Sequence, residues 1–257
     1  MKTEKPFIVG ALGVGTCATI NFFEQWAKVF PAEKEWDRPR IIIDNNCTMP
    51  SRVRALLYNE NVELLVEQMT DSIRLLINAG CSKILIACNT AHVFLEAIYK
   101  KFPEARNYIV DLIENCAAHL QSRGVKKVFL MASEGTILSG VYQEKLQAKG
   151  IECTAPPPED FPIVRSFIEA VKQDKYTAEV KNSFVDFVNR NRLTGGGDYI
   201  LGCTELPVMY EKCSSRLGGM NFYDPMIIVL EKLRAEFEEE RHGKSLAETL
   251  EQPQGKF

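Results

Sequence analysis

Two cysteines of this chain occupy matching positions, each directly after an apolar run. Cys88 follows residues 83–87 and precedes an Asn-Thr pair, whereas Cys203 follows residues 198–202 and precedes a Thr-Glu pair. The apolar runs predict buried parallel strands, and the polar residues beyond them are typical of helix starts. A helix N-terminus lowers the pKa of a thiol and binds anions such as carboxylates. The repeated pattern therefore predicts a two-thiol active site.

Two opposed thiols suit proton transfer at a carbon next to a carboxylate. Inversion at that carbon needs a base on one face and an acid on the other, and a thiolate and a thiol meet that need. A free cysteine with a pKa of about 8.5 is only roughly 3% thiolate at pH 7. We therefore expect the backbone amides of residues 89–91 and 204–205 to lower the pKa of at least one thiol and to hold the substrate carboxylate.

The remaining cysteines and the histidines favour neither a metal site nor disulfides. The chain contains no CxxC pair, and its three histidines are scattered, so we expect no metal ligand set. A chain of 257 residues with 46% hydrophobic composition can bury its own core without disulfides. Reduced thiols in the cytoplasm are therefore the expected state. The cysteines that lack the shared setting are Cys17, Cys47, Cys81, Cys116, Cys153 and Cys213.

Charge and hydropathy indicate a small-molecule partner. A net charge of −3 provides no basic surface for nucleic acid or for an anionic membrane. Lys2 and Lys5, followed by the mostly apolar residues 7–20, imitate a signal peptide, but three glycines interrupt that run. No apolar run approaches transmembrane length. We expect neither a nucleic-acid nor a membrane partner.

Strand-like and helix-like segments alternate along the chain, which predicts an α/β fold with mainly parallel sheets flanked by helices. The expected strands are 7–11, 40–44, 82–87, 125–131, 151–154 and 198–201. The expected helices are 18–30, 61–79, 113–122, 138–148, 163–172, 177–189 and 226–240.

Each half of the chain ends its strand series in a cysteine, which predicts two similar domains that face each other across an active-site cleft. We expect residues 1–111 to form the first domain, with residues 225–240 as a helix that packs back on it. Residues 112–224 would form the second domain, and residues 241–257 a flexible tail.

The chain resembles the aspartate/glutamate racemases, which are amino-acid racemases that work without pyridoxal phosphate, and it is most similar to the aspartate racemase branch. Six segments between about residues 7 and 230 carry this resemblance in the same order. They are Gly13-Val14-Gly15-Thr16-Cys17-Ala18-Thr19, Asn45-Asn46 with Met49-Pro50-Ser51-Arg52, Cys88-Asn89-Thr90-Ala91-His92, Gly135-Thr136-Ile137-Leu138-Ser139-Gly140-Val141-Tyr142, Gly202-Cys203-Thr204-Glu205 and Asp224-Pro225-Met226.

The resemblance implies a role for each matching residue. Cys88 and Cys203 match the two catalytic bases, one for each enantiomer. Arg52 matches a substrate-binding arginine that is suited to bidentate capture of a carboxylate. Lys172 matches a lysine of the same site. The residues expected to line the polar groups of the substrate are Thr16, Asn89, Thr90, Thr136 and Thr204. The resemblance implies no cofactor and an amino-acid substrate. A homodimer is the assembly that we consider, although no residue of the sequence specifies it.

Two residues of these motifs have an ordinary structural interpretation. His92 is taken as structural, and Glu205 as a carboxylate in the first turn of a helix, where it is electrostatically favourable.

The sequence also departs from the family pattern. Aspartate racemases commonly have proline where Thr16 stands and aspartate where Ser51 stands. Glutamate racemases have histidine where Glu205 stands. Relatives that act on hydantoins, maleate or arylmalonates share the fold, and the decarboxylases among them have a single cysteine. The two cysteines of this chain therefore argue for racemisation.

The predicted function is cofactor-independent racemisation of an amino acid, with aspartate or glutamate as the expected substrate. One alternative is a racemase or isomerase of another amino acid or of a dicarboxylate. A second is a relative that binds an amino acid without turnover. A thiol redox protein is the weakest alternative, because no resolving cysteine stands near either candidate in the sequence.

Overall fold

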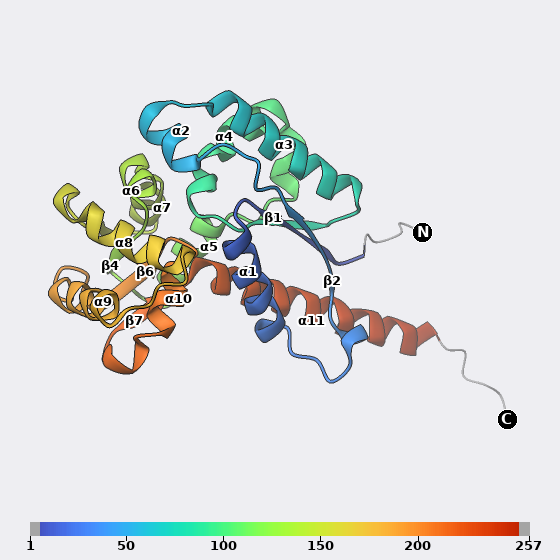
Figure 1. Ribbon diagram of the computed structural model, residues 1–257. Coiled ribbons are helices and arrows are strands. Elements are labelled where there is room, and N and C mark those ends of the chain that lie inside the picture. The colour runs from blue at the N-terminus through green and yellow to red at the C-terminus, as the bar shows by residue number, and fades with distance from the viewer. Residues whose placement is uncertain (1–5, 252–257) are drawn as a thin grey trace.

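The computed structural model describes residues 6–251 and contains two parallel β-sheets flanked by helices (Figure 1). The first sheet has the order β2 (Arg40–Asn45), β1 (Ile8–Gly13) and β3 (Lys83–Ile86). The second sheet has the order β5 (Glu152–Thr154), β4 (Lys127–Met131), β6 (Asp198–Leu201) and β7 (Asn221–Tyr223). Every strand pair is parallel, so the predicted α/β class is confirmed.

Helices cover both faces of each sheet (Figure 1). The α-helices of the described residues are α1 (Thr16–Val29), α2 (Arg52–Tyr58), α3 (Val62–Asn78), α4 (Leu95–Lys101), α5 (Leu112–Ser122), α6 (Glu134–Ser139), α7 (Val141–Ala148), α8 (Phe161–Lys172), α9 (Ala178–Arg190), α10 (Leu206–Glu211) and α11 (Pro225–Glu251).

Alternating side chains of β1 show how this layering arises. Ile8 and Leu12 pack in the cluster that contains the buried residues of α3, whereas Val9 and Ala11 pack in the cluster of α1 and α11. This is the period of two expected for a strand that is buried on both faces. The second sheet is covered in the same way, by α8, α9 and α10 on one face and by α5 and α7 on the other.

The structure corrects two of the predicted helices. The expected helix 138–148 is two helices, because Gly140 adopts a left-handed φ of 73° that ends α6 and begins α7. The expected C-terminal helix 226–240 continues to Glu251 in α11, and the rest of the predicted tail, residues 252–257, lies outside the described residues. The sequence prediction also missed the short elements α2, α4, α10 and β7.

The turn after β1 requires glycine at position 13. A Cβ atom there would overlap the side chain of Thr19, whose hydroxyl shares its one proton between the Gly15 carbonyl at 2.9 Å and Oδ1 of Asn45 at 2.8 Å. These bonds connect α1 to the end of β2. The turn is therefore held tightly at the carboxyl edge of the first sheet.

The two cysteines leave their sheets in the same way. After β3, the Ala87 N–H donates to the Leu12 carbonyl at 2.8 Å, and after β6, the Gly202 N–H donates to the Met131 carbonyl at 2.7 Å. Each sheet thus continues for one more hydrogen bond, and the next residue is Cys88 or Cys203. Both thiols lie beyond the carboxyl ends of parallel strands, where ligands bind in open α/β sheets.

Candidate active site

One cavity of about 310 Å³ contains both predicted catalytic cysteines. Of the predicted site residues, its walls include Thr16, Arg52, Cys88, Asn89, Thr90, Lys172, Cys203 and Thr204. The other lining residues are Val14, Gly15, Cys17, Ala18, Ser51, Val53, Ala87, Ser133, Ile168 and Glu205. The structure therefore gathers residues from the ends of both sheets around one small space.

Cys203 faces a carboxylate. Its thiol donates a hydrogen bond to Oε2 of Glu205 at 3.0 Å, and the hydroxyl of Thr204 donates to the same oxygen at 3.0 Å. Burial and the neighbouring Glu205 raise the pKa of Cys203 well above its usual value, and Cys88 raises it further. The lowered pKa expected of at least one thiol is not found at Cys203, because Glu205 supplies a negative charge and α10 begins only at Leu206.

Cys88 precedes a 3₁₀-helix, η2 (Thr90–Phe94), rather than the predicted α-helix start. The thiol is partly buried, and no side-chain hydrogen bond to its sulfur is present among the described residues. The two thiols thus differ in their surroundings, since only Cys203 faces a carboxylate.

Asn89 is oriented by a side chain from the second half of the chain. The hydroxyl of Tyr142, on α7, donates to Oδ1 of Asn89 at 2.5 Å, and both side chains are buried. Because this bond occupies the amide oxygen, the amide group has its two N–H donors left for other partners. Asn89 therefore brings to the cavity wall an amide whose oxygen is already hydrogen-bonded.

Three hydroxyls connect the two halves of the site behind Asn89. Thr90 shares hydrogen bonds with Thr136 at 2.8 Å and with Ser133 at 3.1 Å, and Ser133 and Thr136 are 3.0 Å apart. Thr136 is completely buried and does not line the cavity, in contrast to its predicted place. It supports Thr90, while Ser133 lines the cavity in its stead.

Arg52 is the first residue of α2, after the N-cap Ser51. Its guanidinium donates to the Pro50 carbonyl at 3.3 Å, and no ion pair to a carboxylate is formed within the described part of the chain. The next arginine on this helix, Arg54, is paired with Glu60 at 2.7 Å. Among the described residues, Arg52 thus brings a guanidinium without an ion-pair partner to the cavity wall.

Lys172 is the last residue of α8 and the second cation of the cavity. It is paired with Glu169 at 2.9 Å. Burial alone would lower the pKa of Lys172, but its bond to Glu169 and the charges of Glu205 and Cys203 raise it above its usual value. The lysine therefore remains charged beside Cys203 and Glu205.

Several residues of the cavity are not predicted by the sequence pattern, above all Glu205, whose expected place is the first turn of a helix, without a role in the site. The sequence shows that Glu205 lies two residues after Cys203, but it does not show that the carboxylate turns toward the thiol. Cys17 lacks the strand context of the two predicted cysteines, yet it lines the cavity together with Thr16. Only its position next to the glycine turn could have indicated this.

The described residues contain no group of three or more His, Cys, Asp or Glu side chains arranged to hold a metal ion. Within residues 6–251, no helix combines the length and the apolar character needed to cross a membrane.

This fold and site define a class of α/β proteins in which each of two parallel sheets contributes one cysteine to a shared cleft. The sequence model of the Asp/Glu/Hydantoin racemase family matches residues 12–233, and the chain belongs to that family.

Individual relatives agree with this assignment. A glutamate racemase from Aquifex aeolicus is 26% identical over 164 residues, which are 63% of this chain and 61% of that protein. The alignment thus spans about three fifths of that relative's length. Picrophilus torridus aspartate racemase has a similar structure, with a TM-score of 0.75 at 28% identity over 90% of this chain and 98% of that one. An aspartate racemase homologue from Pyrococcus horikoshii has the same fold, with a TM-score of 0.71 at 23% identity over 91% of this chain and all of that one.

Proposed function

We propose that this protein is a cofactor-independent amino-acid racemase with aspartate or glutamate as its substrate. The observation that carries the proposal is the presence of Cys88 and Cys203 in one cavity of about 310 Å³, each at the end of a different sheet. Family membership and the aspartate and glutamate racemases among its relatives support the same reaction.

In the proposed reaction the two thiols exchange roles between the two directions. For one enantiomer, the Cys88 thiolate takes the α-hydrogen as a proton, and the electron pair of the broken C–H bond moves into the substrate carboxylate as an enolate. The Cys203 thiol then donates its proton to the opposite face of the carbon and becomes a thiolate. The other enantiomer reacts by the same steps in reverse.

The cations and donors of the cavity suit a substrate with carboxylate groups. Arg52 would bind one carboxylate with its planar guanidinium, and the free N–H donors of Asn89 would assist. Lys172 would offset the negative charge that gathers around Cys203 and Glu205 when Cys203 is a thiolate. Thr16, Thr90 and Thr204 would supply further polar contacts from the cavity wall.

Glu205 favours a resting state in which Cys203 carries a proton. A thiolate at Cys203 would lie against the carboxylate, whereas the thiol donates to it. In this resting state Cys203 is the acid, and Cys88 is the base.

The proposal extends to the setting of the protein. The chemistry uses side chains alone, so we expect no cofactor. It also needs free thiols, which fits the cytoplasm.

A homodimer is also proposed, with support from two exposed apolar side chains on α1, Ile20 and Phe23. Size-exclusion chromatography with light scattering tests that state. The domain limits proposed are 1–111 with 225–240, and 112–224.

Racemisation in deuterated water tests the proposed mechanism. The acid thiol has equilibrated with solvent, so the product should gain deuterium at the α-carbon from the first turnovers while the remaining substrate stays protiated. Cys88→Ala and Cys203→Ala should each abolish racemisation, because each direction needs one acid and one base. Cys116→Ala, at a buried cysteine outside the cavity, is the matched control.

Three outcomes would contradict the proposal. One is an alanine variant of Cys88 or Cys203 that racemises aspartate and glutamate as fast as an active wild type. Another is a product that retains the original α-hydrogen, which indicates a single base. The third is binding of an amino acid without any exchange, which indicates a relative that has no turnover.

A further inference from the structure

The carbonyl of Cys88 receives its hydrogen bond from a side chain. In the 3₁₀-helix that follows, the backbone N–H of His92 donates to the carbonyl of Asn89 at 3.1 Å. An α-helical turn would direct this N–H to the Cys88 carbonyl instead. The ring of His92 fills the vacant place, with Nδ1 at 3.0 Å from the Cys88 oxygen.

The chemistry of this contact decides where the ring carries its proton. A carbonyl oxygen only accepts hydrogen bonds, so Nδ1 must be the protonated nitrogen. His92 is 3% exposed, and its Nε2 is buried without a hydrogen-bond partner in the described structure. The hydrogen bond at Nδ1 is therefore made to the backbone of Cys88.

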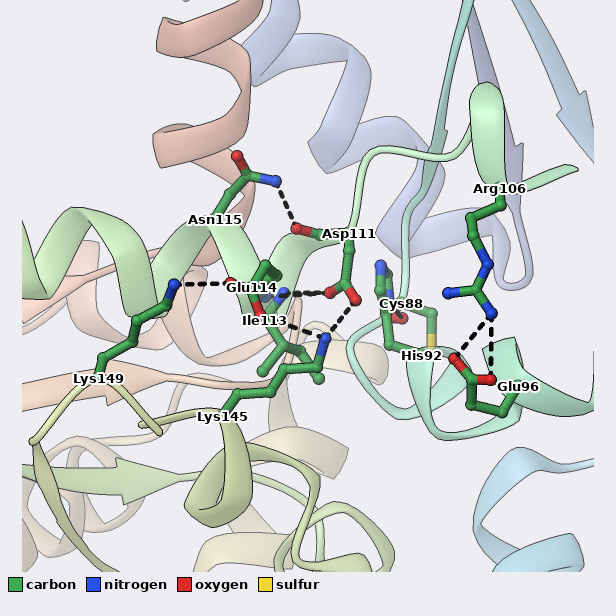
Figure 2. A network of polar contacts seen from close by, with 10 residues as sticks. All are labelled: Cys88, His92, Glu96, Arg106, Asp111, Ile113, Glu114, Asn115, Lys145 and Lys149. Carbon is green, nitrogen blue, oxygen red and sulfur yellow. Dashed lines mark hydrogen bonds and ion pairs between the residues drawn. The ribbon is translucent and has the colours of Figure 1, made fainter. Parts of the chain in front are cut away.

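The charges around the ring come from Asp111, at the start of α5, and from Lys145, on α7. Figure 2 shows His92 beside Cys88, with Asp111 and Lys145 on the side of α5 and α7. Asp111 accepts from the N–H groups of Ile113 at 2.9 Å and Glu114 at 3.1 Å, and it is paired with Lys145 at 2.6 Å.

This surrounding keeps the ring neutral. Burial lowers the pKa of His92 below its usual value, and Lys145 adds to that effect, whereas Asp111 and the bonds to the backbone oppose it. The ion pair with Lys145 at 2.6 Å compensates the charge of Asp111, the carboxylate that acts on the ring. A neutral ring with one N–H is the form that the Cys88 carbonyl requires.

We propose that His92 is a positioning residue for Cys88: its Nδ1–H holds the Cys88 carbonyl and thereby fixes the direction of the thiol and of the following backbone N–H groups. This inference rests on the proposed function, in which Cys88 transfers the α-proton. Because a shift of about 1 Å at a reacting group can reduce the rate about 100-fold, the contact has a direct effect on turnover.

Three variants of His92 test the contact itself. Asparagine places an amide N–H near the position of Nδ1, glutamine places it near the position of Nε2, and leucine removes the donor. We expect His92→Leu and His92→Gln to lower kcat by at least about 10-fold with KM changed less than about 3-fold. His92→Asn should retain kcat to within about 3-fold. His119→Asn, at a histidine on α5 outside the cavity, is the matched control.

A second measurement does not depend on racemisation. Mass spectrometry follows the alkylation of each cysteine by iodoacetamide in the full-length variants. Cys88 should react about 3- to 10-fold more slowly in His92→Leu and His92→Gln than in His92→Asn, because a carbonyl oxygen without its N–H donor keeps its full partial negative charge near the sulfur and disfavours the thiolate. Alkylation of Cys203 should be the same in all three.

The outcomes separate this inference from the proposed function. Equal kcat and equal Cys88 alkylation in the glutamine and asparagine variants would overturn the positioning role, even if His92→Leu fails to fold. A wild type without racemase activity would overturn the proposed function, while the alkylation contrast would still decide the role of His92.

Discussion

The thiol of Cys203 donates a hydrogen bond to Oε2 of Glu205 at 3.0 Å, and Glu205 is only 8% exposed. No other hydrogen bond between a cysteine and a carboxylate occurs among the described residues. This relationship makes the two cysteines of the cavity chemically different, and it leads to the first prediction.

Glu205→Gln should lower the pKa of Cys203, because the amide removes a negative charge from the neighbourhood of the thiol. Alkylation of Cys203 at pH 8 should become about 10-fold faster, which corresponds to about one pKa unit. The basic limb of the pH–rate profile should move to lower pH, since it reports loss of the proton from Cys203. Glu169→Gln, which removes the exposed partner of Lys172, is the control. An unchanged alkylation rate in Glu205→Gln would contradict the prediction.

Arg52→Ala should lower kcat/KM by roughly 10- to 150-fold, as expected for loss of a charge-assisted hydrogen bond to a substrate carboxylate worth about 1.5–3 kcal/mol. Arg52→Lys should restore only part of this, because an ammonium group cannot form the planar fork. Arg54→Ala is the matched control, since Arg54 lies on the same helix and is paired with Glu60. Steady-state kinetics with aspartate and glutamate measure the effect, and wild-type kinetics in a folded Arg52→Ala would remove Arg52 from the site.

Tyr142→Phe should raise KM and destabilise the protein by about 1–3 kcal/mol, because it leaves the buried oxygen of Asn89 without its donor and releases the orientation of the amide. Urea unfolding and kinetics measure the two effects. Tyr223→Phe removes a hydroxyl that donates to Asp198 at 2.8 Å outside the cavity, so it should leave KM unchanged. The same KM in both variants would count against an oriented Asn89.

Asp224→Asn should stabilise the protein at pH 8 but not at pH 4. Burial raises the pKa of Asp224 to about 6, above its value in the unfolded chain, so ionisation of this group opposes folding. The contribution of Asp224 to stability is full below the unfolded pKa and is lost as the pH rises through about 6. Asparagine can still accept the 2.8 Å bond from the Met226 N–H at the start of α11. Urea unfolding at the two pH values should show a gain on the order of 1–3 kcal/mol at pH 8 only.

The strands and long helices could be predicted because their apolar spacing is regular. The strand 198–201 agrees with β6, and the helix 61–79 agrees with α3 to within a residue at each end. Short elements such as α10 and β7 were missed, since six or three residues carry too little periodicity to stand out. The break at Gly140 was missed because the apolar pattern continues across it.

The candidate site was predictable where local sequence carries the chemistry. Each cysteine is preceded by an apolar strand pattern and followed by polar residues, so both could be recognised in the sequence. The structure places them in one cavity. The roles of Glu205 and His92 depend instead on the direction of each side chain. Glu205 turns toward Sγ of Cys203, and His92 turns toward the carbonyl of Cys88. Thr136 shows the opposite error, because a hydroxyl in a matching motif was expected at the substrate and lies behind Thr90.

The carboxylate beside only one thiol has a kinetic consequence. In the proposed reaction, each turnover leaves the free enzyme with its proton on the thiol that began without one. Because Glu205 faces Cys203 alone, the two free-enzyme forms differ in free energy, and the less stable one must exchange protons with water before it can accept the original enantiomer again. Racemisation has an equilibrium constant of one, so kcat/KM is identical in both directions. The asymmetry therefore appears as unequal maximal rates, matched by unequal KM values, for the L and D substrates.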